Sequence, residues 1–143
     1  ELIPPFRGGW CTSFGIWAPG TVGYTQIDAS VLFSADDFRE HILPHYKRLF
    51  KSRDFVLIHT HSTCRRHIEA LLAVDEIPAI QISIDPPPEF GPTAEQLMPV
   101  FQRVQEVKPL VITGPVTQDE LKLMLDTLSP RGLALNVGIE KER

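Results

Sequence analysis

The chain has 143 residues, of which 43% are hydrophobic and 22% are charged, and its net charge is −4. This length and composition fit one domain, residues 1–143, with a hydrophobic core, and the net charge argues against a basic face that binds nucleic acid. Two cysteines are too few for a disulfide framework, and no apolar run approaches the roughly 20 residues of a membrane helix. From the opening residues we expect no signal peptide. We therefore expect a cytoplasmic protein that works without nucleic acid or membrane.

Residues 1–19 are rich in glycine and aromatic side chains and predict a lead-in loop. Apolar runs and amphipathic segments then alternate, which indicates strands followed by helices. The predicted strands are 21–28, 55–58, 79–84, 110–113 and 133–137. The predicted inward-facing helix positions are Phe38, Ile42, Tyr46 and Leu49; Ile68, Leu71 and Leu72; Leu97, Val100, Phe101 and Val104; and Leu121, Met124, Leu125 and Leu128.

Helix starts are marked by a capping residue with a polar partner three positions later. The pairs are Ser34 with Asp37, Thr93 with Gln96, and Thr117 with Glu120. Pro44 lies inside the first helical pattern and is predicted to kink or split that helix, and Pro99 is predicted to bend the first turns of the third.

Five strands joined by four helices predict an α/β fold with a parallel sheet, because right-handed crossovers connect successive strands. The order fits either a segment of a (β/α)₈ TIM barrel or an open doubly wound sheet. A whole barrel needs about 250 residues, so this chain would supply about strands 4–8. The polar residues that end the strands are Asp28, His59, Asp85, Thr113 and Asn136. Barrel active sites lie at carboxyl strand ends, so this distribution favours the barrel.

The segment 55–64, FVLIHTHSTC, places His59 and His61 where an apolar strand ends. Alternation along the strand puts both imidazoles on one side, with Thr60 on the other. Two imidazoles on one side can bind zinc, and Cys64 is a weaker third candidate. In the alternative interpretation, one histidine is buried and hydrogen-bonded while the other caps the following helix.

Carboxyl groups end two predicted strands, at Asp28 and Asp85. Partial burial at a strand end disfavours the charged form of a carboxyl group and raises its pKa, which suits a general acid or base. Local alternatives are an Asx turn at Asp28 and simple strand termination at Asp85. Gln26 is predicted to share the side of Asp28 and to line the barrel interior.

Aromatic residues before and within the first strand include Trp17 and Tyr24. They form either a wall of a substrate cleft or a hydrophobic surface that packs on another part of the protein. With Gln26 and Asn136 they are the candidate substrate-binding residues. Gly114, which follows the run LVIT, predicts a backbone turn or a ligand-facing position.

Several short motifs occur in an order that resembles a known family. They are W-x-P-G-x-V-G, Q-x-D-x-S-x-x-x-S and F-R-x-x-I-L-P, then a strand ending in His, a strand ending in Asp, LVITGPVTQDEL and LALNVGI. This order resembles the uroporphyrinogen decarboxylase superfamily over residues 10–139. The resemblance implies strands four to eight of that family's barrel.

The resemblance implies one of two chemistries: cofactor-free decarboxylation of a porphyrinogen, or zinc-dependent methyl transfer between a corrinoid and a thiol. The decarboxylases have a serine after the Asp28 position and a histidine in the closing turn, where this chain has Ala29 and Val137. The methyltransferases have His-x-Cys at the strand that ends at His59, and a second cysteine near the closing turn. This chain has His61 in place of the first cysteine and lacks the second.

The retained His59 favours zinc-assisted methyl transfer, with Asp28, His59 and Asp85 as catalytic residues and with His59 and His61 as zinc ligands. The alternatives are a decarboxylase, in which the two aspartates orient pyrrole N–H groups, and a degenerate barrel kept as a binding module. We expect a small-molecule partner, a tetrapyrrole, corrinoid or thiol. A second copy of the chain or a missing N-terminal half-barrel is expected to cover the open strand edges.

Overall fold

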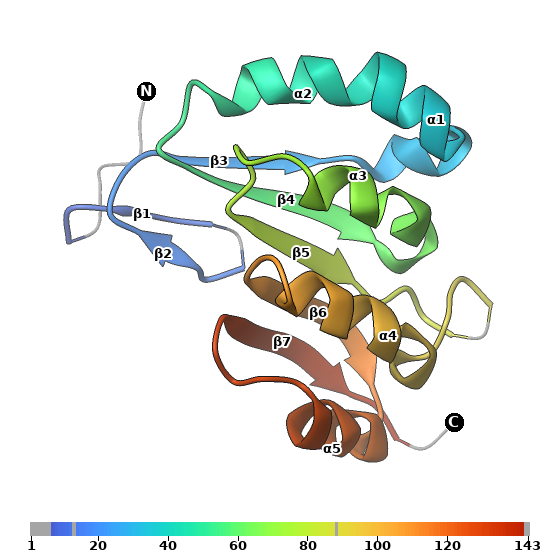
Figure 1. Cartoon of the computed structure of the whole chain (residues 1–143). Coiled ribbons are helices and arrows are strands. Elements are labelled where there is room, and N and C mark those ends of the chain that lie inside the picture. Colours follow the sequence, from blue (N-terminus) through green and yellow to red (C-terminus); the bar gives the residue numbers. More distant parts are fainter. Residues whose placement is uncertain (1–6, 13, 88, 142–143) are drawn as a thin grey trace.

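The computed structural model describes residues 7–12, 14–87 and 89–141. A five-stranded parallel sheet forms its centre, with strand order β3-β4-β5-β6-β7, so that strands adjacent in sequence are adjacent in space (Figure 1). These strands are β3 (Val22–Gln26), β4 (Phe55–His61), β5 (Ala79–Ser83), β6 (Leu110–Val116) and β7 (Leu133–Ile139). The predicted α/β class with a parallel sheet is confirmed.

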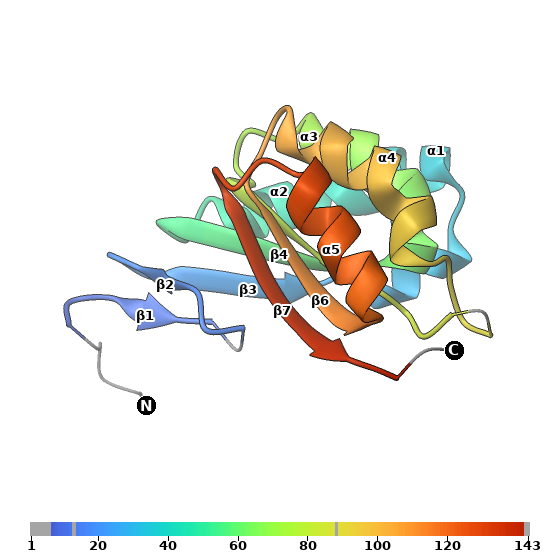
Figure 2. The same ribbon diagram turned by 90° about the horizontal axis from the view of Figure 1, so that it is seen from below.

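The helices cover one face of this sheet, as the view in Figure 2 shows. They are α1 (Ala35–Asp37), α2 (Leu43–Phe50), α3 (Ile68–Leu72), α4 (Ala94–Gln105) and α5 (Gln118–Thr127), with the short turns η1 (Asp28–Leu32), η2 (Phe38–Ile42) and η3 (Ser62–His67). We call this the covered face and the opposite one the open face. Among the described residues, no helix combines the length and hydrophobicity needed to cross a membrane.

The lead-in segment 1–19 contains more order than predicted. In its described part, 7–12 and 14–19, β1 (Trp10–Cys11) and β2 (Trp17–Ala18) pair as an antiparallel ribbon. A pair of two-residue strands offers too little alternation to be seen in the sequence, so this pairing was missed. The ribbon lies beside the amino ends of the parallel strands, where the side chain of Trp17 lines an apolar cavity.

The ends of the first two parallel strands differ from the prediction. β4 continues to His61, because it is paired on both sides and its ladder with β5 reaches His61 opposite Ser83. β3 ends earlier, at Gln26, and Asp28 starts the 3₁₀ turn η1. A backbone turn was one of the two roles predicted for Gly114, but β6 continues through this residue to Val116. Gly114 has φ +111°, and a Cβ there would lie 2.4 Å from the carbonyl oxygen of Ile84, so only glycine allows this approach.

The predicted helix starts are confirmed. Complete capping boxes begin α4 at Thr93 and α5 at Thr117, and the Ser34 hydroxyl accepts a hydrogen bond from the Asp37 amide at the start of α1. Pro44, predicted to kink or split its helix, lies in a helix that is continuous over residues 35–50 but widens into the π-helical turn η2 just before it, and α2 begins at Leu43. A wider turn is the physical answer to a proline that supplies no N–H to the helical ladder.

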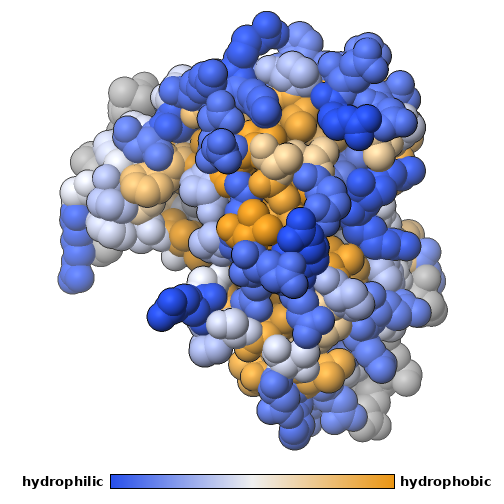
Figure 3. All heavy atoms as spheres, in the orientation of Figure 1, coloured by the Kyte–Doolittle hydropathy of each residue, from blue (hydrophilic) through white to orange (hydrophobic). Residues whose placement is uncertain are grey.

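The core lies between the helices and the covered face. Its strand residues Ile58, Ile80, Ile82, Leu110 and Ile112 and its helix residues Phe38, Leu71, Leu97, Phe101 and Met124 are all nearly or fully buried. Burial of each such side chain contributes about 1.5–3 kcal/mol. Figure 3 shows the outer surface over these helices, mostly hydrophilic with hydrophobic patches between them. Leu125, predicted to face inward, is 61% exposed, because Met124 takes the buried side of α5.

Candidate metal centre

The carboxyl end of β4 carries two imidazoles on the open face. His59 is buried, His61 is partly exposed, and their ring centroids lie 4.8 Å apart with planes at 83°. Thr60, between them, points to the covered face and is fully buried. The predicted alternation is therefore confirmed, and it follows from the pleat of a regular strand.

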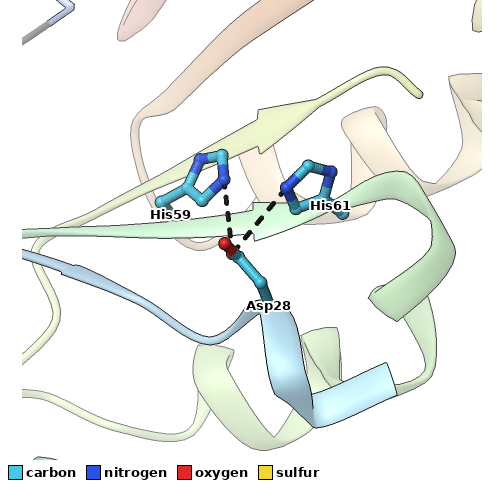
Figure 4. A group of neighbouring side chains, drawn as sticks. All are labelled: Asp28, His59 and His61. Carbon is cyan, nitrogen blue, oxygen red and sulfur yellow. Dashed lines mark ion pairs between the residues drawn. The ribbon is translucent and has the colours of Figure 1, made fainter. Parts of the chain in front are cut away.

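Asp28 adds a carboxylate from the neighbouring strand connection. Its Oδ1 lies 3.4 Å from Nε2 of His59 and 3.7 Å from Nε2 of His61, as Figure 4 shows. Parallel pairing explains the approach: Gln26 is in register with His59, so the residue two positions beyond Gln26 arrives beside the end of β4. One ligand atom from each of the three residues lies within 4.8 Å of the others.

The second ring nitrogen of His59 is held from behind. Nδ1 is hydrogen-bonded to Oε1 of Gln81, and Nε2 of Gln81 donates to Oγ1 of Thr113 at 2.6 Å. The side-chain amide nitrogen of Gln81 is thus engaged with Thr113, and its carbonyl oxygen accepts the Nδ1 proton of His59. Because a carbonyl oxygen only accepts, this contact places a proton on Nδ1 of His59, and Nε2 is the ring nitrogen that faces Asp28.

The second ring nitrogen of His61 is held by Asp85. Nδ1 of His61 lies 2.5 Å from Oδ1 of Asp85, and Oδ2 of Asp85 accepts hydrogen bonds from Ser62 Oγ (2.8 Å) and from the amide and hydroxyl of Thr63 (3.2 Å each). Burial raises the pKa of Asp85, but the hydrogen bonds from His61, Ser62 and Thr63 together bring it below its ordinary value. The raised pKa predicted for this carboxyl group is therefore wrong. Ionised Asp85 thus holds Nδ1 of His61 and orients the ring so that Nε2 faces Asp28.

Three candidate ligand atoms thus converge, one from each of Asp28, His59 and His61. Two imidazole nitrogens and a carboxylate oxygen are a ligand set of zinc and of other divalent transition metals. Ligand atoms at about 2.1 Å from a tetrahedral zinc lie about 3.4 Å from one another. The distances of 3.4 Å and 3.7 Å from Asp28 Oδ1 to the two Nε2 atoms are close to this value, and all three ligand atoms lie within 4.8 Å of one another. A histidine that binds a metal through one ring nitrogen usually donates the N–H of its other ring nitrogen to a polar group. Gln81 and Asp85 are those groups for His59 and His61.

Aromatic rings flank the buried histidine. Phe14 stacks on His59 with centroids 5.9 Å apart, and Tyr24 lies 6.2 Å from the same ring and 5.4 Å from Phe14. Gln26 donates from Nε2 to the Tyr24 hydroxyl at 3.2 Å. Cys64 is buried, with Sγ 3.9 Å from the backbone carbonyl of Asp28, and does not belong to the converging set.

The structure brings together Asp28, His59, His61 and Asp85, with Tyr24 and Gln26 beside them, and it places the other two candidates elsewhere. Trp17 lines an apolar cavity of about 420 Å³ at the amino ends of the strands. Asn136 is exposed on β7, opposite Thr113. Sequence reasoning missed Gln81, whose signal was a polar residue inside the apolar run AIQIS, and Ser62, for which the sequence carries no distinct signal.

Comparison of the chain with protein-family models, curated proteins and solved structures gives no match. The sequence resemblance therefore gains no independent support. The chemistry of this centre rests on its own geometry: three converging donors, each imidazole oriented by a second polar group.

Proposed function

We propose that His59, His61 and Asp28 bind a catalytic zinc ion in an enzyme that transfers a methyl group between a corrinoid and a thiol. The observation that supports a metal site is that the Nε2 atoms of His59 and His61 both lie near Asp28. Gln81 and Asp85 hold the Nδ1 atoms of the two rings. The choice of thiol and corrinoid as substrates comes from the sequence resemblance to the zinc-dependent branch of the uroporphyrinogen decarboxylase superfamily.

The donor set suits catalysis better than a purely structural role. Three protein ligands leave a coordination position for substrate, whereas structural zinc sites use four. Zinc held there would supply Lewis acidity that keeps a thiol ionised at neutral pH. Asp28 is the most exposed of the three ligands and marks the side from which a substrate reaches the centre. Phe14 and Tyr24 flank His59 and keep water from the other side.

The arrangement of the sheet supports the further proposal that β3 to β7 are strands four to eight of a (β/α)₈ barrel. Strand order follows sequence order, and the helices lie on one face, whereas a doubly wound sheet covers both faces and reorders its strands. The metal centre lies at the carboxyl end of β4, which is the end used for catalysis in barrel enzymes.

Calorimetric titration with Zn²⁺ tests the metal. We expect one ion per chain in the wild type and binding at least about 100-fold weaker in His59→Ala and Asp28→Ala, because each removes a ligand. His41→Ala is the matched control, since His41 is exposed and outside the centre, and it should bind as the wild type does. Wild-type protein that binds no zinc, or ligand variants that bind it equally well, would overturn the metal assignment. Loss of methylcobalamin with a thiol acceptor then tests the reaction.

The pairing of Asp85 with His61 favours a second candidate, cofactor-free decarboxylation of a porphyrinogen. An imidazole backed by a carboxylate is suited to proton transfer. Turnover of a porphyrinogen by chelator-treated protein, lost in His61→Gln, would select this candidate over methyl transfer. Zinc binding without turnover in either assay would indicate a binding module.

A further inference from the structure

A chain of buried polar side chains crosses three strands on the open face. It consists of Thr113 on β6, Gln81 on β5 and His59 on β4, and we call it the polar relay. Gln81 is 0% exposed and the other two are nearly buried. A buried amide is costly unless its donor and acceptor are both satisfied, and here Thr113 and His59 satisfy one each. No helix covers this face in the described part of the chain, so helix packing does not account for the relay.

The orientation of the Gln81 amide determines which ring nitrogen of His59 carries the proton. If the Gln81 amide were reversed, its N–H would donate to Nδ1 of His59 and the imidazole proton would move to Nε2, facing Asp28. In that arrangement the Gln81 carbonyl oxygen would accept from the Thr113 hydroxyl and the Nε2 proton would face Asp28 Oδ1 at 3.4 Å, so the two arrangements differ in which ring nitrogen can bind a metal. The orientation in the structure, with the Gln81 N–H donated to Thr113, puts the His59 proton on Nδ1 and leaves Nε2 able to bind a metal.

We infer that Gln81 is a positioning residue that keeps the His59 proton on Nδ1 and Nε2 toward the metal, and that the hydrogen bond to Thr113 fixes the Gln81 amide in this orientation. The inference rests on the proposed metal function. Charge supports an amide at this position: Asp28 and Asp85 already bring two negative charges, which balance one divalent cation. Gln81 supplies the acceptor that His59 needs without adding a third charge.

Nitrogen-15 NMR of the histidine side chains tests the relay directly, because it distinguishes the two tautomers in the metal-free protein. We expect the wild type to show His59 protonated on Nδ1. Gln81→Leu removes the acceptor, so we expect mixed tautomers and zinc binding about 10–100-fold weaker, the usual cost of losing such a partner. Gln81→Glu keeps an acceptor for Nδ1 of His59 and should keep the tautomer of the wild type.

Two further variants separate positioning from damage to the fold. Thr113→Val removes the hydroxyl that accepts the hydrogen bond from the Gln81 amide. We expect it to weaken zinc binding less than Gln81→Leu does. Ile82→Val lies next to Gln81 but on the covered face, and it should change neither the tautomer nor the affinity. Urea unfolding of each variant reports whether it is folded.

Two results would overturn the inference: an Nε2-protonated His59 in the metal-free wild type, or zinc binding by folded Gln81→Leu as tight as that of the wild type. Failure of the wild type to bind zinc would reject the metal function instead, while the tautomer still decides whether Gln81 controls His59. If Gln81→Leu does not fold, Thr113→Val and Gln81→Glu carry the test.

Discussion

The two faces of the same sheet differ in what their buried side chains do. On the covered face, Ile58, Ile80 and Ile112 pack against helices in a continuous apolar core. On the open face, His59, Gln81 and Thr113 are buried almost as deeply but are joined by hydrogen bonds. Burial alone therefore does not identify the core of this protein. The covered face forms the apolar core and the open face carries the polar side chains of the candidate metal centre, although both arise from alternate residues of the same strands.

Phe101→Ala should have the largest effect on stability. Phe101 is fully buried between α4 and the covered face, and loss of a buried phenylalanine side chain costs about 3–5 kcal/mol in unfolding free energy. Urea denaturation measures this. A loss below about 1 kcal/mol would contradict the assignment of the apolar core to the covered face.

Zinc should stabilise the wild type through the open face. A free zinc concentration 100 times the dissociation constant adds about 2.7 kcal/mol to the unfolding free energy when only the folded state binds. We expect this gain to disappear in His61→Ala and to be reversed by a chelator. Thermal unfolding with and without zinc measures it, and an equal gain in His61→Ala would place the metal elsewhere.

Thr60→Val tests whether the covered face accepts a polar group. Thr60 is fully buried there, and its hydroxyl has no hydrogen-bond partner among the described residues. Valine has nearly the same shape without the hydroxyl, so we expect a gain of about 1 kcal/mol in unfolding free energy. A loss of stability on urea denaturation would show that the hydroxyl is satisfied.

His67 should make stability depend on pH. Burial lowers the pKa of His67 below its ordinary 6.5, and its Nε2 is hydrogen-bonded to the carbonyl of Ser30. The unfolded state then binds the proton more readily, so the stability due to neutral His67 is complete above about pH 6.5 and is lost as the pH falls toward the lower folded pKa. His67→Gln should flatten this part of the pH profile of unfolding free energy. An unchanged profile would contradict the prediction.

Leu125→Ser should have the smallest effect. The side chain is 61% exposed, so we expect a change within about 0.5 kcal/mol. Met124→Ala, one position earlier and fully buried, is the matched comparison and should cost about 2–5 kcal/mol in urea unfolding. Equal losses from the two variants would mean that α5 presents a different face to the sheet.

The sequence predicted the fold at the level of elements. Capping boxes at Thr93 and Thr117 and the effect of Pro44 were visible because they depend on residues within one turn. Strand ends were less predictable: β4 reaches His61 because of its ladder with β5, which is a non-local interaction. Leu125 was misplaced because two adjacent apolar residues on a helix leave its buried side ambiguous.

The candidate centre was predictable in part. The pair His59 and His61 followed from strand alternation, and Asp28 and Asp85 followed from their positions at the ends of predicted strands, although β3 itself ends at Gln26. What the sequence could not supply was the division of roles, in which Asp28 faces both Nε2 atoms while Asp85 holds one ring from behind. Gln81 lies 22 residues from His59 along the chain, and only the register of β4 with β5 brings them together.

Zinc-edge anomalous diffraction from crystals soaked in Zn²⁺ tests the central claim most directly, because it locates the metal without reference to activity. We predict one peak per chain, within about 2.0–2.2 Å of Nε2 of His59, Nε2 of His61 and a carboxylate oxygen of Asp28. A fully occupied peak at other residues, or no peak at this centre at saturating zinc, would contradict the account.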